Sequence, residues 1–393
     1  MFLTASNLYF YLRDTGLASP SDIVDGDYGL SEIGRRNRNF RIVGTGERSI
    51  FVKQVPAVIP ETVLSFMREA ACAQLAAEAA PAGVLHNVSA ALRRYDHKTH
   101  VLVYDALEAN ESLSEFALRR GGAALREIAE RLGLMLASIH TETMKPGALG
   151  PISSVMTGEV PWVFIITKDA ETVMPNMSGG CRQVVDLLRQ MTDLSGQLTE
   201  LGQQWRRLCL MHGDMKSENV VIVRRPDGSR EIKLVDWELA NIGEPLWDAA
   251  GVLCLFVLQW LFTIPVDGTT PPAGTPPGDT EALANTKKNA EAFWGTYLGK
   301  MRGVLPKDDD ATLRVGRLTG ARLVLLAFEM LPNVATISPH AMVALQLARY
   351  LAVDPANALR DLLGILAEPS SAAAEGPRSA EPVEPWKLPA EQV

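Results

Sequence analysis

Two carboxylates and an amide lie close together in the C-terminal half of the sequence. Asp214 ends a His-Gly-Asp run, and Asn219 follows it five positions later. Asp236 ends the next apolar run, so the three side chains are expected at one edge of a hairpin. A carboxylate can accept the proton of an attacking hydroxyl, and oxygen ligands can hold the Mg²⁺ that neutralises the phosphates of ATP. These residue types therefore favour phosphoryl transfer, and Asp214, Asn219 and Asp236 together supply the carboxylate and the oxygen ligands that it needs.

A cation and a further carboxylate lie upstream, in an order that suits the same chemistry. Lys53 is near the end of an apolar run, and Glu69 lies on the helix that follows it. The transition state of phosphoryl transfer depends mainly on positioning and charge stabilisation, so a cation on the phosphates is expected. Lys53 is in a suitable place for this role, and Glu69 is expected to hold it.

Local patterns predict the elements that must position these groups. Runs rich in β-branched and aromatic residues on either side of a turn predict a hairpin, and apolar residues at helical spacing predict a helix. In chain order these elements are a short helix within 1–24, a hairpin formed by 39–43, the turn 44–47 and 48–54, a helix at 61–78, a strand at 101–107, a helix ending near His140, and a second hairpin from 208–223 through 226–228 to 232–240. The second hairpin carries Asp214, Asn219 and Asp236.

The distribution of these elements predicts an α+β fold with two lobes. Residues 1–108 form a small N-terminal nucleotide-binding lobe with an antiparallel sheet and one helix, and 109–368 form a larger, mostly helical catalytic and substrate lobe. Proline, glycine and threonine mark 264–280 as a mobile loop. The segment 369–393 is rich in Pro, Ala, Glu and Ser, which predicts a disordered tail.

Composition and charge limit the class of protein. With 393 residues, 47% hydrophobic and 21% charged, the chain has the profile of a globular protein, which excludes collagen-like, coiled-coil and largely disordered chains. The net charge of −8 argues against a general nucleic-acid partner, because proteins that bind nucleic acids generally have a basic surface. The apolar stretch 249–262 is shorter than the roughly 20 residues of a membrane-spanning helix, so no membrane partner is expected.

The cysteines and the N-terminus indicate the compartment. The four cysteines form no CxxC pair, which argues against a zinc site or a redox dithiol and suggests free thiols in a reducing cytosol. The first residues lack the basic start and cleavage site of a signal peptide. A cytoplasmic protein is therefore expected.

HGDMKSEN (212–219) and LVDWE (234–238) resemble the catalytic loop and metal-binding segment of the aminoglycoside phosphotransferase and choline kinase-like family, relatives of protein kinases. The resemblance covers about 30 to 350. It implies a protein kinase-like fold and ATP and Mg²⁺ as cofactors. It also implies Asp214 as catalytic base, Asn219 and Asp236 as magnesium ligands, and Lys53 paired with Glu69 on the α and β phosphates. An alternative is that the Asp and Asn residues merely cap turns.

The segment 29–40 has the position of the phosphate-covering loop in this family but lacks its glycine series. Arg36 and Asn37, with their arginine neighbours, could offer hydrogen-bond donors to phosphate, which makes them candidate nucleotide-binding residues. The alternative is a solvated basic hairpin.

Lys216 bears on the acceptor. Many small-molecule phosphotransferases of this family carry His at its position, whereas Ser/Thr protein kinases carry a Lys that contacts the γ-phosphate. Lys216 therefore counts as a catalytic candidate and favours a seryl or threonyl hydroxyl slightly; a surface lysine is the alternative. NLYFYLRDTGL (7–17) and the strand pair ending in FVKQ (51–54) also resemble stand-alone kinases of class V lanthipeptide and thioamitide pathways. These phosphorylate a precursor peptide before a separate lyase eliminates phosphate.

Two other functions stay open. FVKQ is also similar to methylthioribose kinase, so a small-molecule acceptor such as an aminoglycoside, choline or methylthioribose is an alternative substrate. A pseudokinase that acts as a scaffold subunit is an alternative from another class. The sequence names neither the acceptor nor the oligomeric state, and it does not distinguish ATP from GTP.

Overall fold

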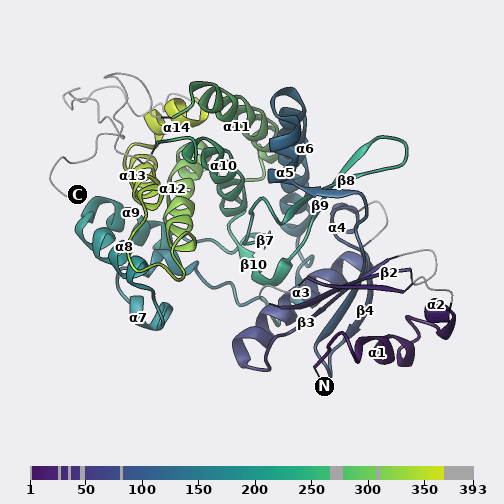
Figure 1. The fold of residues 1–393 in the computed structure, drawn as a ribbon. Coiled ribbons are helices and arrows are strands. Elements are labelled where there is room, and N and C mark those ends of the chain that lie inside the picture. The colour runs from purple at the N-terminus through teal and green to yellow at the C-terminus, as the bar shows by residue number, and fades with distance from the viewer. Residues whose placement is uncertain are drawn as a thin grey trace, which may run out of the picture. The chain divides into compact units, whose positions relative to one another are not determined.

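The computed structural model describes residues 2–24, 28–33, 37–44, 49–79, 83–265, 278–306 and 310–366 (Figure 1). These residues form two compact units that interleave along the chain. Unit 1 consists of Met1–Arg120, Glu142–Thr157 and His212–Ile242, and unit 2 consists of Gly121–Thr141, Gly158–Met211 and Gly243–Val393. Arg36, most of the loop predicted at 264–280 and the tail predicted at 369–393 lie outside the described residues.

A five-stranded antiparallel sheet forms the N-terminal part of unit 1, in the order β1-β2-β3-β5-β4. The strands are β1 (Gly29–Glu32), β2 (Arg38–Val43), β3 (Ile50–Gln54), β4 (Leu92–Asp96) and β5 (Val101–Asp105). The predicted hairpin is confirmed as β2 and β3, and β5 confirms the third predicted strand. The edge strands β1 and β4 were not predicted.

The two faces of this sheet pack against different helices. On one face, Val52 and neighbouring apolar residues pack with Leu8 and Leu12 of α1 (Leu8–Asp14). On the other face, Leu102 and Tyr104 pack with Phe66 of α3 (Pro60–Glu78). Side chains alternate along a strand, so Lys53, next to Val52, lies on the face that α3 covers.

Helix α3 is held in place by a polar side chain next to Glu69. Arg68 is buried, and its guanidinium donates to the backbone oxygen of Val155 and to Oγ1 of Thr157, at 3.3 and 2.9 Å. Both partners lie in the 142–157 segment of unit 1, near the short helix η1 (Gly150–Ile152). The α3 residues that face the sheet are therefore fixed from two sides. The short helices α2 (Pro20–Val24), α4 (Val84–Val88) and α5 (Leu113–Arg120) also belong to this unit.

The second predicted hairpin is confirmed as β8 (Val220–Arg224) and β9 (Arg230–Leu234), which β6 (Asn110–Ser112) extends to a three-stranded sheet. Val220 pairs with Leu234, and the backbone N–H of Val235 donates to the oxygen of Asn219 at 3.0 Å. The residues just before β8 and just after β9 are thereby brought to the same end of the hairpin. A single 3₁₀ turn, η3 (Trp237–Leu239), follows.

Unit 2 is mostly helical. Its main elements are α6 (Gly122–Thr143, of which the last two residues belong to unit 1), η2 (Trp162–Phe164), α7 (Ala170–Val173), α8 (Gly179–Gln190), α9 (Thr192–Gln203), α10 (Pro245–Leu261), α11 (Thr280–Met301), α12 (Ala311–Glu329), α13 (Pro339–Val353) and α14 (Pro355–Leu363). The short strand β7 (Cys209–Met211) lies in unit 2, and β10 (Asn241–Gly243) crosses from unit 1 into unit 2.

Helix α10 is buried along most of its length, as expected of the apolar stretch 249–262. None of the helices among the described residues has the length and hydropathy needed to cross a membrane.

Polar groups at the start of α10 are paired in the interior. Nε2 of His140 lies 3.4 Å from Asp248, and Nδ1 of His140 lies 2.9 Å from the Tyr297 hydroxyl. His140 thus packs within unit 2. All four cysteines are buried and free.

Candidate active site

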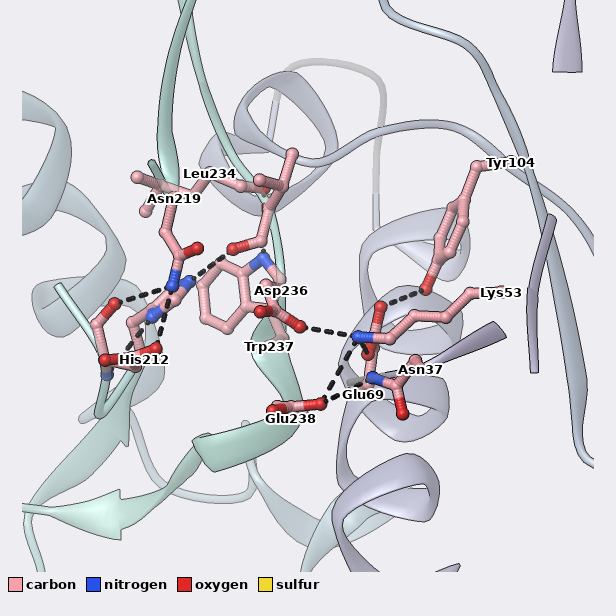
Figure 2. A network of polar contacts seen from close by, with 12 residues as sticks. Asn37, Lys53, Glu69, Tyr104, His212, Asn219, Leu234, Asp236, Trp237 and Glu238 are labelled. Carbon is pink, nitrogen blue, oxygen red and sulfur yellow. Dashed lines mark hydrogen bonds and ion pairs between the residues drawn. The ribbon is translucent and has the colours of Figure 1, made fainter. Parts of the chain in front are cut away.

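The ammonium group of Lys53 is the centre of a carboxylate cluster in unit 1 (Figure 2). Lys53 is only 5% exposed. Its Nζ donates to Oε2 of Glu69 at 2.5 Å and to Oδ1 of Asp236 at 2.5 Å. Oε2 of Glu238 lies 3.5 Å away. The predicted pair of Lys53 and Glu69 is present, and Asp236, which is 183 residues from Lys53 in the sequence, joins it.

Burial and charge act against each other in this cluster. Burial opposes the charged form of Lys53, but the carboxylates around it raise its pKa above the ordinary value. Burial raises the pKa of Glu69, although Lys53 opposes that rise. The pKa of Asp236 is lowered: burial opposes ionisation, but the Lys53 charge and hydrogen bond prevail. One ammonium group therefore faces several carboxylates, and the cluster has an excess of negative charge.

This excess of negative charge and the type of ligand atom suit a divalent cation. Carboxylate oxygens of Glu69, Asp236 and Glu238 lie within 4.8 Å of one another, and Mg²⁺ prefers such hard oxygen ligands. Asp236 is the predicted ligand among them. These carboxylates therefore fit the expected Mg²⁺. Asp236 is the most exposed of the three, with 31% of its side chain accessible to solvent.

The proposed base, Asp214, lies on the loop before β8 and is 6% exposed. Its Oδ2 accepts hydrogen bonds from Nζ of Lys216 at 2.5 Å and from Nδ2 of Asn219 at 3.0 Å. The Asn219 amide also donates to the backbone oxygen of Asp214 at 2.9 Å. The amide nitrogen of Asn219 is therefore turned to Asp214. The other polar atom of this amide is an oxygen, which is the type of ligand atom that Mg²⁺ takes.

His212 and Trp237 join the loop of Asp214 to the turn of Asp236. His212 Nε2 lies 3.0 Å from the backbone oxygen of Val235, and its ring lies 4.7 Å from that of Trp237. Nε1 of Trp237 donates to the oxygen of Leu234 at 3.2 Å. Asp236 itself has a φ of 66°, a left-handed conformation that is uncommon for residues other than glycine. Its carboxylate contacts Nζ of Lys53.

Gly213, between His212 and Asp214, has no room for a side chain. Its φ is +81°, and a Cβ there would lie 2.3 Å from the backbone oxygen of Leu239. We expect Gly213→Ala to displace the loop and to lower the free energy of unfolding by about 2–4 kcal/mol, since strain at φ and overpacking add. Gly228→Ala is the matched control, because Gly228 has a φ of +84° but nothing within 4 Å of a Cβ. Urea unfolding of both variants measures this; equal losses would contradict the steric argument.

Asn37, a candidate nucleotide-binding residue, donates from Nδ2 to Oε2 of Glu238 at 3.0 Å. Asn37 thus ties the segment before β2 to the turn after Asp236. Glu238 is also part of the cluster, a place that was not predicted from the sequence. Its position two residues after Asp236, with the same charge, was the available signal. Tyr104, whose hydroxyl contacts Glu69, was missed as well.

Comparison with protein families agrees with the resemblance seen in the sequence. Residues 31–273 match the model of the phosphotransferase enzyme family called APH. Among solved structures, a choline/ethanolamine kinase family protein from Mesorhizobium loti is similar, with 18% identity, a TM-score of 0.49 and coverage of 90% of this chain and 97% of that one. A putative aminoglycoside phosphotransferase from Ralstonia eutropha shows 15% identity, a TM-score of 0.49 and coverage of 89% and 96%.

Two curated relatives share a shorter stretch. Acyl-CoA dehydrogenase family member 11 of Mus musculus and its counterpart of Rattus norvegicus are each 45% identical to this chain over 58 residues. The match covers 15% of this chain but only 7% of the length of either relative.

The family match spans well over half of the chain and includes Lys53, Glu69, Asp214 and Asp236. The chain therefore belongs to the APH phosphotransferase enzyme family. Family membership confirms the predicted resemblance, the predicted α+β fold with an N-terminal antiparallel sheet and a mostly helical C-terminal part, and the prediction of a phosphotransferase, that is, a kinase.

Proposed function

We propose that this phosphotransferase moves the γ-phosphate of ATP, bound with Mg²⁺, to an alcohol hydroxyl. The observation that carries the proposal is the cluster around Lys53, in which one buried cation faces Glu69, Asp236 and Glu238. Such a cluster combines a cation for the phosphates with oxygen ligands for a metal, the two parts that phosphoryl transfer requires. Bound Mg²⁺ would neutralise charge on the phosphates.

The chain's own residues divide the remaining work. Asp214 accepts the proton of the acceptor hydroxyl as its oxygen attacks the γ-phosphorus, and the bond from that phosphorus to the bridging oxygen of ADP breaks. Lys53, held by Glu69, binds the α and β phosphates. Asn219 and Asp236 hold the metal, and Lys216 stabilises charge on the transferred group.

For the acceptor we favour a seryl or threonyl hydroxyl of a ribosomally made precursor peptide, followed by elimination through a separate lyase. The support is the contact of Lys216 with Asp214, which places an ammonium group beside the base. In the protein kinase arrangement this lysine contacts the transferring phosphate. A small-molecule alcohol, such as an aminoglycoside, choline or methylthioribose, is the second candidate. A cytoplasmic location stays a prediction.

Replacing Lys216 by Ala tests this role. If its charge acts on the transferring phosphate, kcat should fall about 10- to 100-fold while the affinity for MgATP changes little, because the interaction strengthens only in the transition state. Initial-rate kinetics with a responsive acceptor measures both constants. Lys233→Ala is a control, because Lys233 instead contacts Glu231 on the hairpin and the backbone oxygen of Asn87 on α4. An unchanged kcat would make Lys216 a surface lysine.

The proposed function is tested in two steps. First, saturating MgATP should raise the melting temperature, since a ligand that binds the native state stabilises it. No stabilisation would favour a pseudokinase. Second, mass spectrometry should detect phosphate on one acceptor from a panel of a Ser/Thr-rich precursor peptide, an aminoglycoside, choline and methylthioribose. Phosphate on the peptide supports the favoured acceptor, and phosphate on a small molecule alone supports the second candidate.

A further inference from the structure

The carboxylate of Glu69 is held at both oxygens. Oε2 accepts from Nζ of Lys53 at 2.5 Å, and Oε1 accepts from the hydroxyl of Tyr104 at 3.2 Å (Figure 2). All three residues are buried, with Lys53 and Glu69 each 5% exposed and Tyr104 8% exposed. Lys53 is therefore contacted by a carboxylate whose orientation depends on a second residue.

The register of the sheet explains why Tyr104 reaches this position. On the neighbouring strands β3 and β5, Lys53 pairs with Leu102, and Phe51 pairs with Tyr104. Tyr104 is two residues beyond Leu102, so it lies on the same face of the sheet as Lys53 and is its diagonal neighbour. Helix α3 covers that face and presents Glu69 to both side chains. Sheet and helix thus form a rigid chain of contacts from Tyr104 through Glu69 to Lys53.

We propose that Tyr104 is a positioning residue for nucleotide binding, which fixes the Glu69 carboxylate so that Lys53 is aimed at the phosphates. The inference rests on the proposed function, because it requires Lys53 to bind ATP. Tyr104 acts through Glu69 and touches neither the phosphates nor the reacting atoms.

Competition for Lys53 gives this contact its importance. Asp236 lies as close to Nζ as Glu69 does, and Glu238 also lies within 3.5 Å. A Glu69 side chain without its second hydrogen bond can rotate about its last torsion, and the ammonium group can then shift toward the other two carboxylates.

The test measures the Kd of MgATP by calorimetry, which requires no knowledge of the acceptor. Tyr104→Phe should raise this Kd about three- to tenfold, the range expected when one hydrogen bond to a charged group is lost and part of its effect reaches the ligand. Tyr11→Phe is the matched control and should leave the Kd unchanged. Tyr11 is also a buried tyrosine of unit 1 whose hydroxyl faces a carboxylate, Asp96, at 3.4 Å.

A double-mutant cycle separates positioning from a general structural role. In a Glu69→Ala background Tyr104 has no carboxylate to hold, so adding Tyr104→Phe should change the Kd less than twofold. The same three- to tenfold rise in both backgrounds, or a Kd of Tyr104→Phe equal to that of the wild type, would overturn the inference. If Glu69→Ala does not fold, Glu69→Gln replaces it, with a reduced effect of Tyr104→Phe expected. Failure of the wild type to bind MgATP would instead overturn the proposed function.

Discussion

Replacing Asp214 by Asn should lower kcat by about 10²- to 10⁴-fold, the usual contribution of general-base catalysis, while the affinity for MgATP stays within about twofold. Asn has the same shape but cannot accept the hydroxyl proton. The side chain of Asp214 contacts Lys216 and Asn219 rather than the Lys53 cluster, so nucleotide binding has no direct need of its charge. Turnover with a responsive acceptor gives kcat, and calorimetry gives the Kd of MgATP.

The matched control is Asp227→Asn. Asp227 lies in the turn of the same hairpin, where it accepts a hydrogen bond from the backbone N–H of Ser229 at 2.9 Å. The change in net charge is the same, but the site is not affected, so activity should be that of the wild type. Full activity of Asp214→Asn would remove Asp214 from the mechanism.

Replacing Lys53 by Met should abolish detectable MgATP binding and lower the free energy of unfolding by about 3–5 kcal/mol at pH 8, the cost of leaving a buried charge unpaired. The reason is that Glu69 and Asp236 each have Lys53 at 2.5 Å. Urea unfolding gives the stability, and calorimetry gives the binding. Lys98→Met is the control, because it removes the same charge at an exposed residue of unit 1. It should change neither the free energy of unfolding nor the binding of MgATP.

The loss of stability in Lys53→Met should shrink as the pH falls from 8 toward 5. Burial raises the pKa of Glu69 even in the presence of Lys53, and the variant lacks the charge that opposes this rise. When the pKa of a carboxyl group is higher in the folded than in the unfolded protein, the group adds to the free energy of unfolding at low pH. This contribution is complete at a pH below the unfolded pKa, and it is lost as the pH rises through the folded pKa. In the wild type, Lys53 has a raised pKa, so its contribution is complete at every pH below its unfolded value. A loss that is independent of pH would contradict this account.

The sequence predicted those parts of the fold that depend on neighbouring residues. Both hairpins were found because their strands are rich in β-branched residues and are joined by short turns. The pair of Lys53 and Glu69 was found because its members are 16 residues apart, on a strand and the helix that follows it. The edge strand β4 was missed because Arg93 and Arg94 are exposed in succession, which breaks the alternation that indicates a half-buried strand.

Contacts between distant segments were beyond prediction from the sequence. Asn37 and Glu238 are 201 residues apart, and nothing local to either indicates the hydrogen bond that joins them. Such a contact depends on how distant segments pack within unit 1, which follows from their buried surfaces rather than from spacing.

The interleaving of unit 1 has a consequence for synthesis on the ribosome. Lys53 and Glu69 can pair as soon as α3 has left the exit tunnel, but Asp236 is made 183 residues after Lys53. At translation rates of about 5–20 residues per second, this delay is about 10–40 s. During that time the nascent chain has a lysine–glutamate pair but lacks Asp236, and unit 2 segments are already emerging. The site is therefore completed late, by the docking of His212–Ile242 onto a sheet formed earlier.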